Sequence, residues 1–268
     1  HKTSKVKGFM NRDNIDINIE GRIILDMYTY VLREQKLRSY SLNNVSFQFL
    51  GEQKEDVHHS LITTLWQQNE YTRRRLGVYC MKDAYLPLKL ADHLMTVFNY
   101  TEMCRVTSTP LNFILTRGQQ IKVATQLHKK ALELNYIIPT IRINKSAVDN
   151  DEEGYEGAFV LDPVVGFHEQ PIVTLDFSSL YPSIMMAHNI CYSTLLSNED
   201  IKNMDKNDYY EAPTGSCFVK EHIRKGILPR ILEEIISARK KAKVDLNNET
   251  DVFKKKVLNG RQLALKVS

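Results

Sequence analysis

The residues best suited to chemistry stand in one segment, IVTLDFSSLYPSI, at positions 172–184. Its apolar first half predicts a β-strand that ends at Asp176, and Ser178 and Ser179 are small residues suited to a turn. Pro182 has a preset φ that suits the first turn of a helix. A carboxylate at a strand end, facing the free N–H groups of a new helix, can hold a divalent cation beside a bound phosphate. The same pattern also fits Asp176 as an ordinary turn or helix-capping residue.

A basic pair lies in SARKKAKV, at positions 237–244. Arg239 and Lys243 are four residues apart, so a helix presents both on one face, roughly 6 Å from each other, suited to two oxygens of one triphosphate. Such pairs are also commonly solvated, and RKKAK could equally be a nuclear localisation signal. The last 49 residues hold 13 Lys and Arg against six Asp and Glu, whereas the whole chain has a net charge of +4. An anion-binding surface, or a solvated helical face, is therefore expected at this end.

Two further segments contain residue types that serve catalysis or nucleic-acid binding. In YCMKDAYLP, Tyr79 and Asp83 share one helical face, and Pro87 cannot donate to the Asp83 carbonyl, so the helix is expected to loosen there. A tyrosine near a carboxylate is also commonplace in helices. In GYEGA, Tyr155 could stack on a base and Gly157 allows close approach to single-stranded DNA, although a glycine turn before a strand explains this segment equally well.

The elements that must position these residues follow from hydrophobic periodicity. Residues 72–100 and 111–134 have helical spacing, and RIIL at 22–25 is typical of a strand, with Asp26 near its end read as structural. A polar, acidic stretch at 144–157 predicts a surface loop that divides the chain. After it, AFVL at 158–161 and IVTL at 172–175 predict a small sheet.

The C-terminal part predicts two amphipathic helices. Apolar residues recur with helical spacing at 227–235 and, more loosely, at 252–265, and the polar sequence DLNNETD at 245–251 joins them. Helices with a short connection are expected to pack antiparallel as a hairpin, with their basic side chains facing away from the seam.

Composition excludes several classes of protein. With 43% hydrophobic residues, 268 residues can bury a real core, while no apolar run approaches the eighteen residues of a membrane span and no secretory signal is visible. The four cysteines contain no CxxC pair, which argues against a zinc site or a disulfide framework. We expect a soluble intracellular protein. Because the chain starts with His1 and ends at Ser268 inside a predicted helix, we also expect a piece of a longer protein.

DFSSLYPSI resembles motif A of family B DNA polymerases, DxxSLYPSI, at every defined position. The resemblance implies that Asp176 binds both catalytic Mg²⁺ ions and that the Phe177 carbonyl binds one of them. It also implies that Ser179 and Leu180 offer backbone N–H groups to the incoming triphosphate, and that Tyr181 lies under the sugar and excludes ribonucleotides. The implied nucleotide-binding run is Phe177, Ser178, Ser179, Leu180 and Tyr181.

The other segments resemble motifs of the same family. Arg239 and Lys243 fall where these enzymes place the triphosphate-binding residues of the fingers, and GRQLALKVS resembles the start of motif B, Kx₃NSxYG, with Lys266 as its phosphate-binding lysine. YCMKDAYLP resembles exonuclease motif III, YxxxD, which implies that Asp83 binds a metal and that Tyr79 orients the attacking water. GYEGA is similar to the YxGG or YxGA loop near the template strand, which implies DNA contacts for Tyr155 and Gly157.

Longer stretches resemble the polymerase delta branch of the family. They are LREQKLRSYSLNNVSFQFLGEQKEDVHHS, RVTSTPLNFILTRGQQIKV and MMAHNICYSTLL. This resemblance implies a nuclear replicative enzyme that works with primer–template DNA, dNTPs, a sliding clamp and accessory subunits. Archaeal and viral family B enzymes share the motifs and remain alternatives.

The expected fold class is mixed α/β (α+β), with four segments implied by the resemblance. They are the C-terminal part of a ribonuclease H-like 3′–5′ exonuclease domain (1–104), a helical connector (105–150), an incomplete palm with motif A (151–226) and helical-hairpin fingers (227–268). The DTD of motif C and exonuclease motifs I and II have no match in this sequence. We therefore expect the isolated chain to be inactive, and it could be only a noncatalytic nucleotide- or DNA-binding module.

Overall fold

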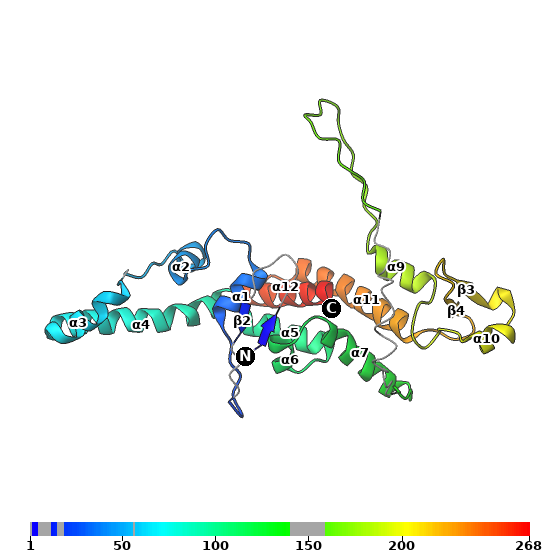
Figure 1. Cartoon of the computed structure of the whole chain (residues 1–268), viewed down its shortest axis with the longest axis horizontal. Coiled ribbons are helices and arrows are strands. Elements are labelled where there is room, and N and C mark those ends of the chain that lie inside the picture. The colour runs from blue at the N-terminus through cyan, green and yellow to red at the C-terminus, as the bar shows by residue number, and fades with distance from the viewer. Residues whose placement is uncertain (1, 5–11, 15–18, 56, 140–158) are drawn as a thin grey trace. The chain divides into compact units, whose positions relative to one another are not determined.

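A computed structural model describes residues 2–4, 12–14, 19–55, 57–139 and 159–268, and helices predominate among them (Figure 1). The helices are α1 (Met27–Glu34), α2 (Leu42–Leu50), α3 (Ile62–Gln68), α4 (Glu70–His93), α5 (Thr96–Thr107), α6 (Leu111–Thr116), α7 (Gln120–Glu133), α9 (Leu180–Ala187), α10 (Asn198–Lys202), α11 (Ile227–Asn248) and α12 (Val252–Val267), with 3₁₀ turns at His59–Leu61 and Lys206–Asp208. The strands form two separate antiparallel pairs, β1 (Lys2–Ser4) with β2 (Arg12–Asn14) and β3 (Tyr209–Glu211) with β4 (Cys217–Val219). In this part of the chain, no helix has the length and apolar character needed to cross a membrane.

The chain forms two compact units. The first comprises His1–Thr125 and Ala238–Ser268, and the second comprises Gln126–Ser237. The first unit is built on a cluster of buried side chains from five helices: Tyr30, Val31, Val45, Leu90, Tyr100 and Ile114. The second unit has a smaller cluster: Ala131, Cys191, Ile227 and Ile231. Each unit therefore has its own apolar core.

The predicted helices before residue 135 are confirmed, with breaks inside both ranges. The 72–100 range contains most of α4 and the start of α5, and the chain turns at Met95, whose φ of 53° is left-handed. Asn69 and Thr72 form a capping box that starts α4, and α4 continues through Pro87. The 111–134 range is likewise divided into α6 and α7. Periodicity finds the helices but not the backbone reversals between them.

The three predicted strands are wrong for the described residues. Arg22 to Leu25 form no strand; instead Leu25 packs against the first core, and Asp26 caps α1 by accepting from the Tyr28 backbone N–H at 2.9 Å. The reading of Asp26 as structural is thus confirmed. Residues 159–161 and 172–175 are exposed and do not pair as strands. Figure 1 shows them in the extended trace that precedes α9 and has no regular secondary structure. Strands need hydrogen-bonded neighbours, and no hydrogen-bonded strand pairing is found for these segments among the described residues.

The small sheet of the second unit is a hairpin that the sequence analysis missed. Tyr209 pairs with Val219, and Glu211 pairs with Cys217. Gly215 has a φ of 82° in the turn, a conformation that glycine adopts without strain. The Pro-Thr-Gly-Ser sequence at 213–216, between two runs of strand-forming residues, was the available signal.

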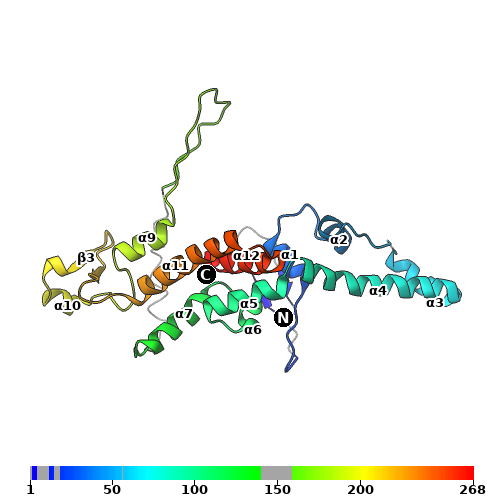
Figure 2. The ribbon, with the colours of Figure 1, turned by 180° about the vertical axis from the view of Figure 1, so that it is seen from behind.

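The two C-terminal helices are confirmed, but their connection is shorter than predicted, and the expected packing of the two helices against each other as a hairpin is not borne out by the contacts of the described residues. Helix α11 continues to Asn248, so only 249–251 join it to α12. Asp251 caps α12 through the Lys254 backbone N–H at 2.8 Å. The partner that α12 contacts closely is α5, as both views show (Figures 1 and 2), and the rings of Phe98 and Phe253 meet edge to face at 5.3 Å. Nothing in the sequence pattern indicated this pairing.

Candidate functional site

Asp176 stands at the end of an unpaired extended segment, immediately before a turn and α9. Its carboxylate is exposed and has no hydrogen-bond or ion-pair partner among the described residues. The turn at Ser178 and Ser179 is confirmed, and so is the helix that follows it with Pro182 in its first turn. The expected strand in front of Asp176 is absent. The sequence therefore located the turn and the helix correctly, but the carboxylate is free of any sheet.

The turn into α9 has an uncommon backbone. Ser179 has φ 53° and ψ 48°, the left-handed region that costs a non-glycine residue free energy. The Ser179 carbonyl accepts from the Ser183 N–H at 2.9 Å, which closes the first turn of the helix. Phe177 and Leu180 are exposed, and the Tyr181 side chain is 76% exposed. The whole run from Phe177 to Tyr181 is thus accessible to a ligand.

Asn189 holds the other end of α9, and the sequence analysis missed it. Its side chain is buried, with a relative exposure of 1%, and its amide nitrogen donates to the carbonyls of Val219 at 2.7 Å and Arg224 at 2.8 Å. Its amide oxygen accepts from the Gly226 N–H at 2.8 Å. A side chain at Gly226 would place its Cβ 2.7 Å from that of Cys191, so this site requires glycine. Asn189 therefore joins the helix after motif A to β4 and to the start of α11.

The basic residues singled out near the C-terminus lie on α11 and α12. Arg239 and Lys243 are one helical turn apart, as predicted, with Ala242 buried beside them. Lys243 is exposed, whereas Arg239 is half-buried and its Nε has no hydrogen-bond partner among the described residues. Lys266 is exposed near the end of α12. A buried guanidinium N–H without a partner is costly, which makes Arg239 receptive to an anionic acceptor.

Tyr79 and Asp83 are brought together on α4 with a third residue, Lys54. The Lys54 Nζ lies 2.8 Å from Asp83 Oδ1 and 3.3 Å from the Tyr79 hydroxyl, and 5.0 Å from the centre of the tyrosine ring. Burial by itself lowers the pKa of Lys54, but the hydrogen bonds to Asp83 and Tyr79 outweigh it and leave that pKa raised. Lys54 is therefore a charged partner for Asp83, and its distance in sequence hid it from spacing arguments.

A second set of ion pairs holds the loop that carries Lys54 against α4. The Glu52 carboxylate binds both Lys82 and Lys89, the latter at 2.5 Å. Hydrogen bonds from these two ammonium groups, of which the bond from Lys82 has the larger effect, lower the pKa of Glu52 to about 2. The Lys54 N–H also donates to the Asn43 side chain on α2 at 3.0 Å. The loop is thus fixed at Glu52 and at the Lys54 backbone.

The donor groups at both sites suit a hard cation. Mg²⁺ takes oxygen ligands, usually one or two carboxylates together with substrate phosphates. Asp176 and the Phe177 carbonyl offer such oxygens on an accessible turn, and Asp83 offers a half-buried carboxylate. Within the described ranges, no three His, Cys, Asp or Glu side chains gather where they could hold a metal ion. Each site therefore fits one part of a metal-binding set.

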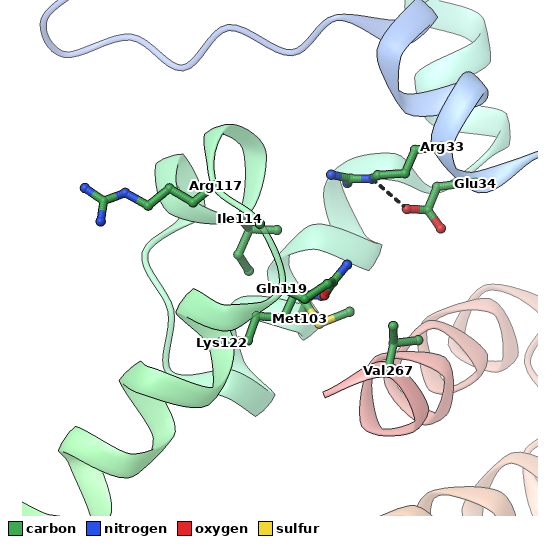
Figure 3. A pocket seen from close by; sticks show the side chains of 9 residues that line it. Arg33, Glu34, Met103, Ile114, Arg117, Gln119, Lys122 and Val267 are labelled. Carbon is green, nitrogen blue, oxygen red and sulfur yellow. Dashed lines mark hydrogen bonds and ion pairs between the residues drawn. The ribbon is translucent and has the colours of Figure 1, made fainter. Parts of the chain in front are cut away.

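The first unit also has a small pocket of about 80 Å³, shown in Figure 3. Its lining residues are Arg33, Glu34, Met103, Ile114, Arg117, Gly118, Gln119, Lys122 and Val267. Arg33 is already engaged by Glu34 at 3.0 Å and by the Tyr100 hydroxyl at 2.5 Å, and Arg117 lies over the Phe113 ring. The pocket is too small for a nucleotide, and its cations have partners.

Tyr155 and Gly157 lie outside the described residues, so their predicted DNA contacts have no structural counterpart here.

Comparison with known proteins gives consistent matches. Residues 109–268 match "DNA polymerase family B", and residues 1–45 match "DNA polymerase family B, exonuclease domain". The chain is 57% identical to the DNA polymerase delta catalytic subunit of Candida albicans over 98% of its length, and 56% identical to that of Schizosaccharomyces pombe over 99%. It spans about a quarter of the length of these curated relatives, 25% and 24% respectively.

A solved structure shares the fold. The family B DNA polymerase of Pyrobaculum calidifontis superimposes on 93% of this chain and 32% of its own, with a TM-score of 0.66 and 24% sequence identity. The sequence match to the family covers more than half of the chain. The chain therefore belongs to DNA polymerase family B.

Proposed function

We propose that this chain is a segment of a replicative DNA-directed DNA polymerase of the delta type, an enzyme that extends a primer with dNTPs and proofreads it by 3′–5′ exonuclease action. The observation that carries the proposal is the 52–57% identity to delta catalytic subunits over at least 96% of the chain. Archaeal and viral family B enzymes are the alternatives. The proposed location is the nucleus, and the proposed partners are primer–template DNA, a sliding clamp and accessory subunits.

Four segments of this enzyme are proposed in the chain. Residues 1–104 belong to the C-terminal part of the ribonuclease H-like exonuclease domain, 105–150 connect it to the palm, 151–226 form the first part of the palm, and 227–268 form the fingers. The exonuclease match at 1–45 and the polymerase match from 109 support this order. The α11 and α12 pair supports the helical fingers.

Synthesis would use the exposed turn before α9. Asp176 and the Phe177 carbonyl would hold Mg²⁺, and a pair of such ions stabilises the attacking 3′-oxygen and the leaving pyrophosphate. Free N–H groups at Ser179 and Leu180 would bind triphosphate oxygens, with Ser178 in the same run. Tyr181 would pack against the sugar C2′ and leave no room for a hydroxyl. The accessibility of the whole turn supports these roles.

The basic helices would bind the triphosphate. Arg239 has an unpartnered, buried Nε, and Lys243 lies one turn away on the same helix. Lys266 is exposed on α12. A guanidinium and an ammonium group one turn apart match two phosphate oxygens. Tyr155 and Gly157 are proposed to contact the template strand.

Proofreading would use the site on α4. Asp83 would bind a metal ion and Tyr79 would orient the attacking water. Lys54 touches both side chains, so it would hold the Asp83 carboxylate in place and keep the phenol hydroxyl oriented.

Primer extension with Mg²⁺ tests the proposal on the complete enzyme, beside the isolated 268 residues. The complete enzyme should extend a primer and remove a mismatched 3′ end. The isolated chain should do neither, because motif C and exonuclease motifs I and II have no match in it. Failure of the complete enzyme to extend a primer would refute the proposed function. Primer extension by the isolated chain would refute the proposal that it holds only part of the active site. Nucleotide binding without activity would fit a binding module.

A further inference from the structure

A buried carboxylate joins two helices that lie far apart in the sequence. The Glu102 side chain on α5 is 4% exposed, and its Oε1 accepts from Arg105 Nη1 at 2.7 Å. Its Oε2 lies 3.0 Å from Arg261 Nε on α12. A carboxylate removed from water is costly unless a cation compensates it. Arg105 supplies part of that compensation from α5 itself, and Arg261 adds a second positive charge only when α12 lies against α5.

The packing around this ion pair is close. Gly260 is buried opposite Asn99, and a Cβ at Gly260 would fall well inside van der Waals contact with the Asn99 side chain. Asn99 cannot easily move away, because its amide donates to the Leu94 carbonyl at 3.1 Å. The register of α12 on α5 is thus determined both by shape and by charge.

This register decides where Lys266 points. Ala264 and Leu265 are buried, and Lys266, the next residue, is exposed. Since each residue of an α-helix is rotated by about 100° from the one before it, a small rotation of α12 would redirect the Lys266 side chain. Lys266 lies five residues beyond Arg261 on the same helix. The Glu102 carboxylate can therefore act on Lys266 through Arg261.

We propose that Glu102 is a positioning residue for nucleotide binding, which anchors α12 through Arg261 and so orients Lys266 toward the triphosphate. The inference rests on the proposed function, because it takes Lys266 as a phosphate-binding residue. It also links the segment proposed as exonuclease domain, which contains Glu102, to the fingers. Glu102 itself touches neither substrate nor metal in this scheme.

The test is single-turnover incorporation by the complete enzyme with Glu102→Gln, Arg261→Gln and the double variant. Each single variant should raise the apparent dNTP dissociation constant about fivefold, as for residues that act on a site through a network, and leave the maximal rate within about twofold. The double variant should be no worse than either single one, because both remove the same interaction. Arg261 is 49% exposed, and in Arg261→Gln the Glu102 carboxylate keeps its 2.7 Å ion pair with Arg105, so this variant should fold even where Glu102→Gln is unstable.

Two controls separate positioning from stability. Glu221→Gln removes an exposed carboxylate that pairs with Lys225 at 2.8 Å in the second unit, and it should leave the dNTP dissociation constant unchanged. Thermal unfolding of every variant shows how much stability each change removes. An unchanged dNTP dissociation constant in Arg261→Gln, or additive effects in the double variant, would overturn the proposal. Absence of primer extension by the wild-type enzyme would instead remove the proposed function.

Discussion

The two carboxylates singled out by the motifs, Asp83 and Asp176, have opposite surroundings. Asp83 lies on the long helix α4, half-buried, with Lys54 at 2.8 Å and Tyr79 one turn away. Asp176 follows an extended segment without strand partners, is exposed, and has no partner among the described residues. A helix satisfies its backbone internally, whereas a strand needs neighbours from elsewhere in the fold. The surroundings of Asp83 are therefore held together within the first unit, whereas the segment that carries Asp176 has no strand neighbours among the described residues.

The largest effect is expected from Asp176→Ala in the complete enzyme. Loss of a group that stabilises transition-state charge should lower the rate of synthesis at least about a thousandfold and leave proofreading intact. Because Asp176 is exposed and unpartnered, the melting temperature should stay unchanged. Single-turnover extension, mismatch removal and thermal unfolding measure the three quantities. Retained synthesis would show that Asp176 is only a turn residue.

Asp83→Ala should have the complementary effect. Degradation of a mismatched primer should slow by about a hundredfold or more, while synthesis continues. The variant should also lose about 1 kcal/mol of stability, since Lys54 loses its partner but can regain water near the surface. Excision assays and denaturant unfolding of the same preparation check both points. A variant that loses stability and keeps full excision would assign the Lys54–Asp83 pair a structural role alone.

Tyr181→Ala should reduce sugar discrimination by about tenfold to a hundredfold, because the space beside C2′ would then admit a hydroxyl. The ratio of incorporation efficiencies for a dNTP and the matching ribonucleotide measures this. Tyr192→Ala is a suitable control, since Tyr192 is an equally exposed tyrosine outside motif A. Unchanged discrimination would remove Tyr181 from its proposed role.

Arg239→Ala and Lys243→Ala should each weaken dNTP binding by about tenfold, the cost of one charge-assisted hydrogen bond. Binding of primer–template DNA should change less. The Arg239 variant should not be less stable, because its Nε has no partner to lose among the described residues. Equal affinity for dNTP in wild type and both variants would identify this helical face as merely solvated.

The smallest effect concerns pH and the loop that carries Lys54. The pKa of Glu52 is about 2 in the folded chain, against an ordinary value of 4.5, so its pairing with Lys82 and Lys89 stabilises the fold above pH 4.5. This stabilisation should disappear as the pH falls from about 4.5 to 2. Glu52→Gln should lower the melting temperature at pH 7 and match wild type near pH 2. A constant difference across this range would contradict the assignment.

Sequence periodicity was sufficient wherever structure is local. The helices at 70–93 and 227–248, the turn at Ser178 and Ser179, and the spacing of Arg239 and Lys243 all follow from side-chain pattern and turn chemistry. The strand predictions were wrong because an apolar, β-branched run indicates only that a segment is able to pair as a strand. Whether it pairs depends on neighbours that no local pattern contains.

The sequence alone determined the family, through motif A and its flanks, and it determined which residues carry ionisable and phosphate-binding groups. Only the tertiary structure brought together the ion pairs Lys54–Asp83 and Glu102–Arg261. It alone also placed Asn189 where its side chain hydrogen-bonds to β4 and to the start of α11. These pairs are separated by 29, 30 and 159 positions in the numbering, so no helical or strand period relates them. Burial decided the partners of Asn189 and Glu102, because a polar group removed from water must find its partner wherever the fold places it.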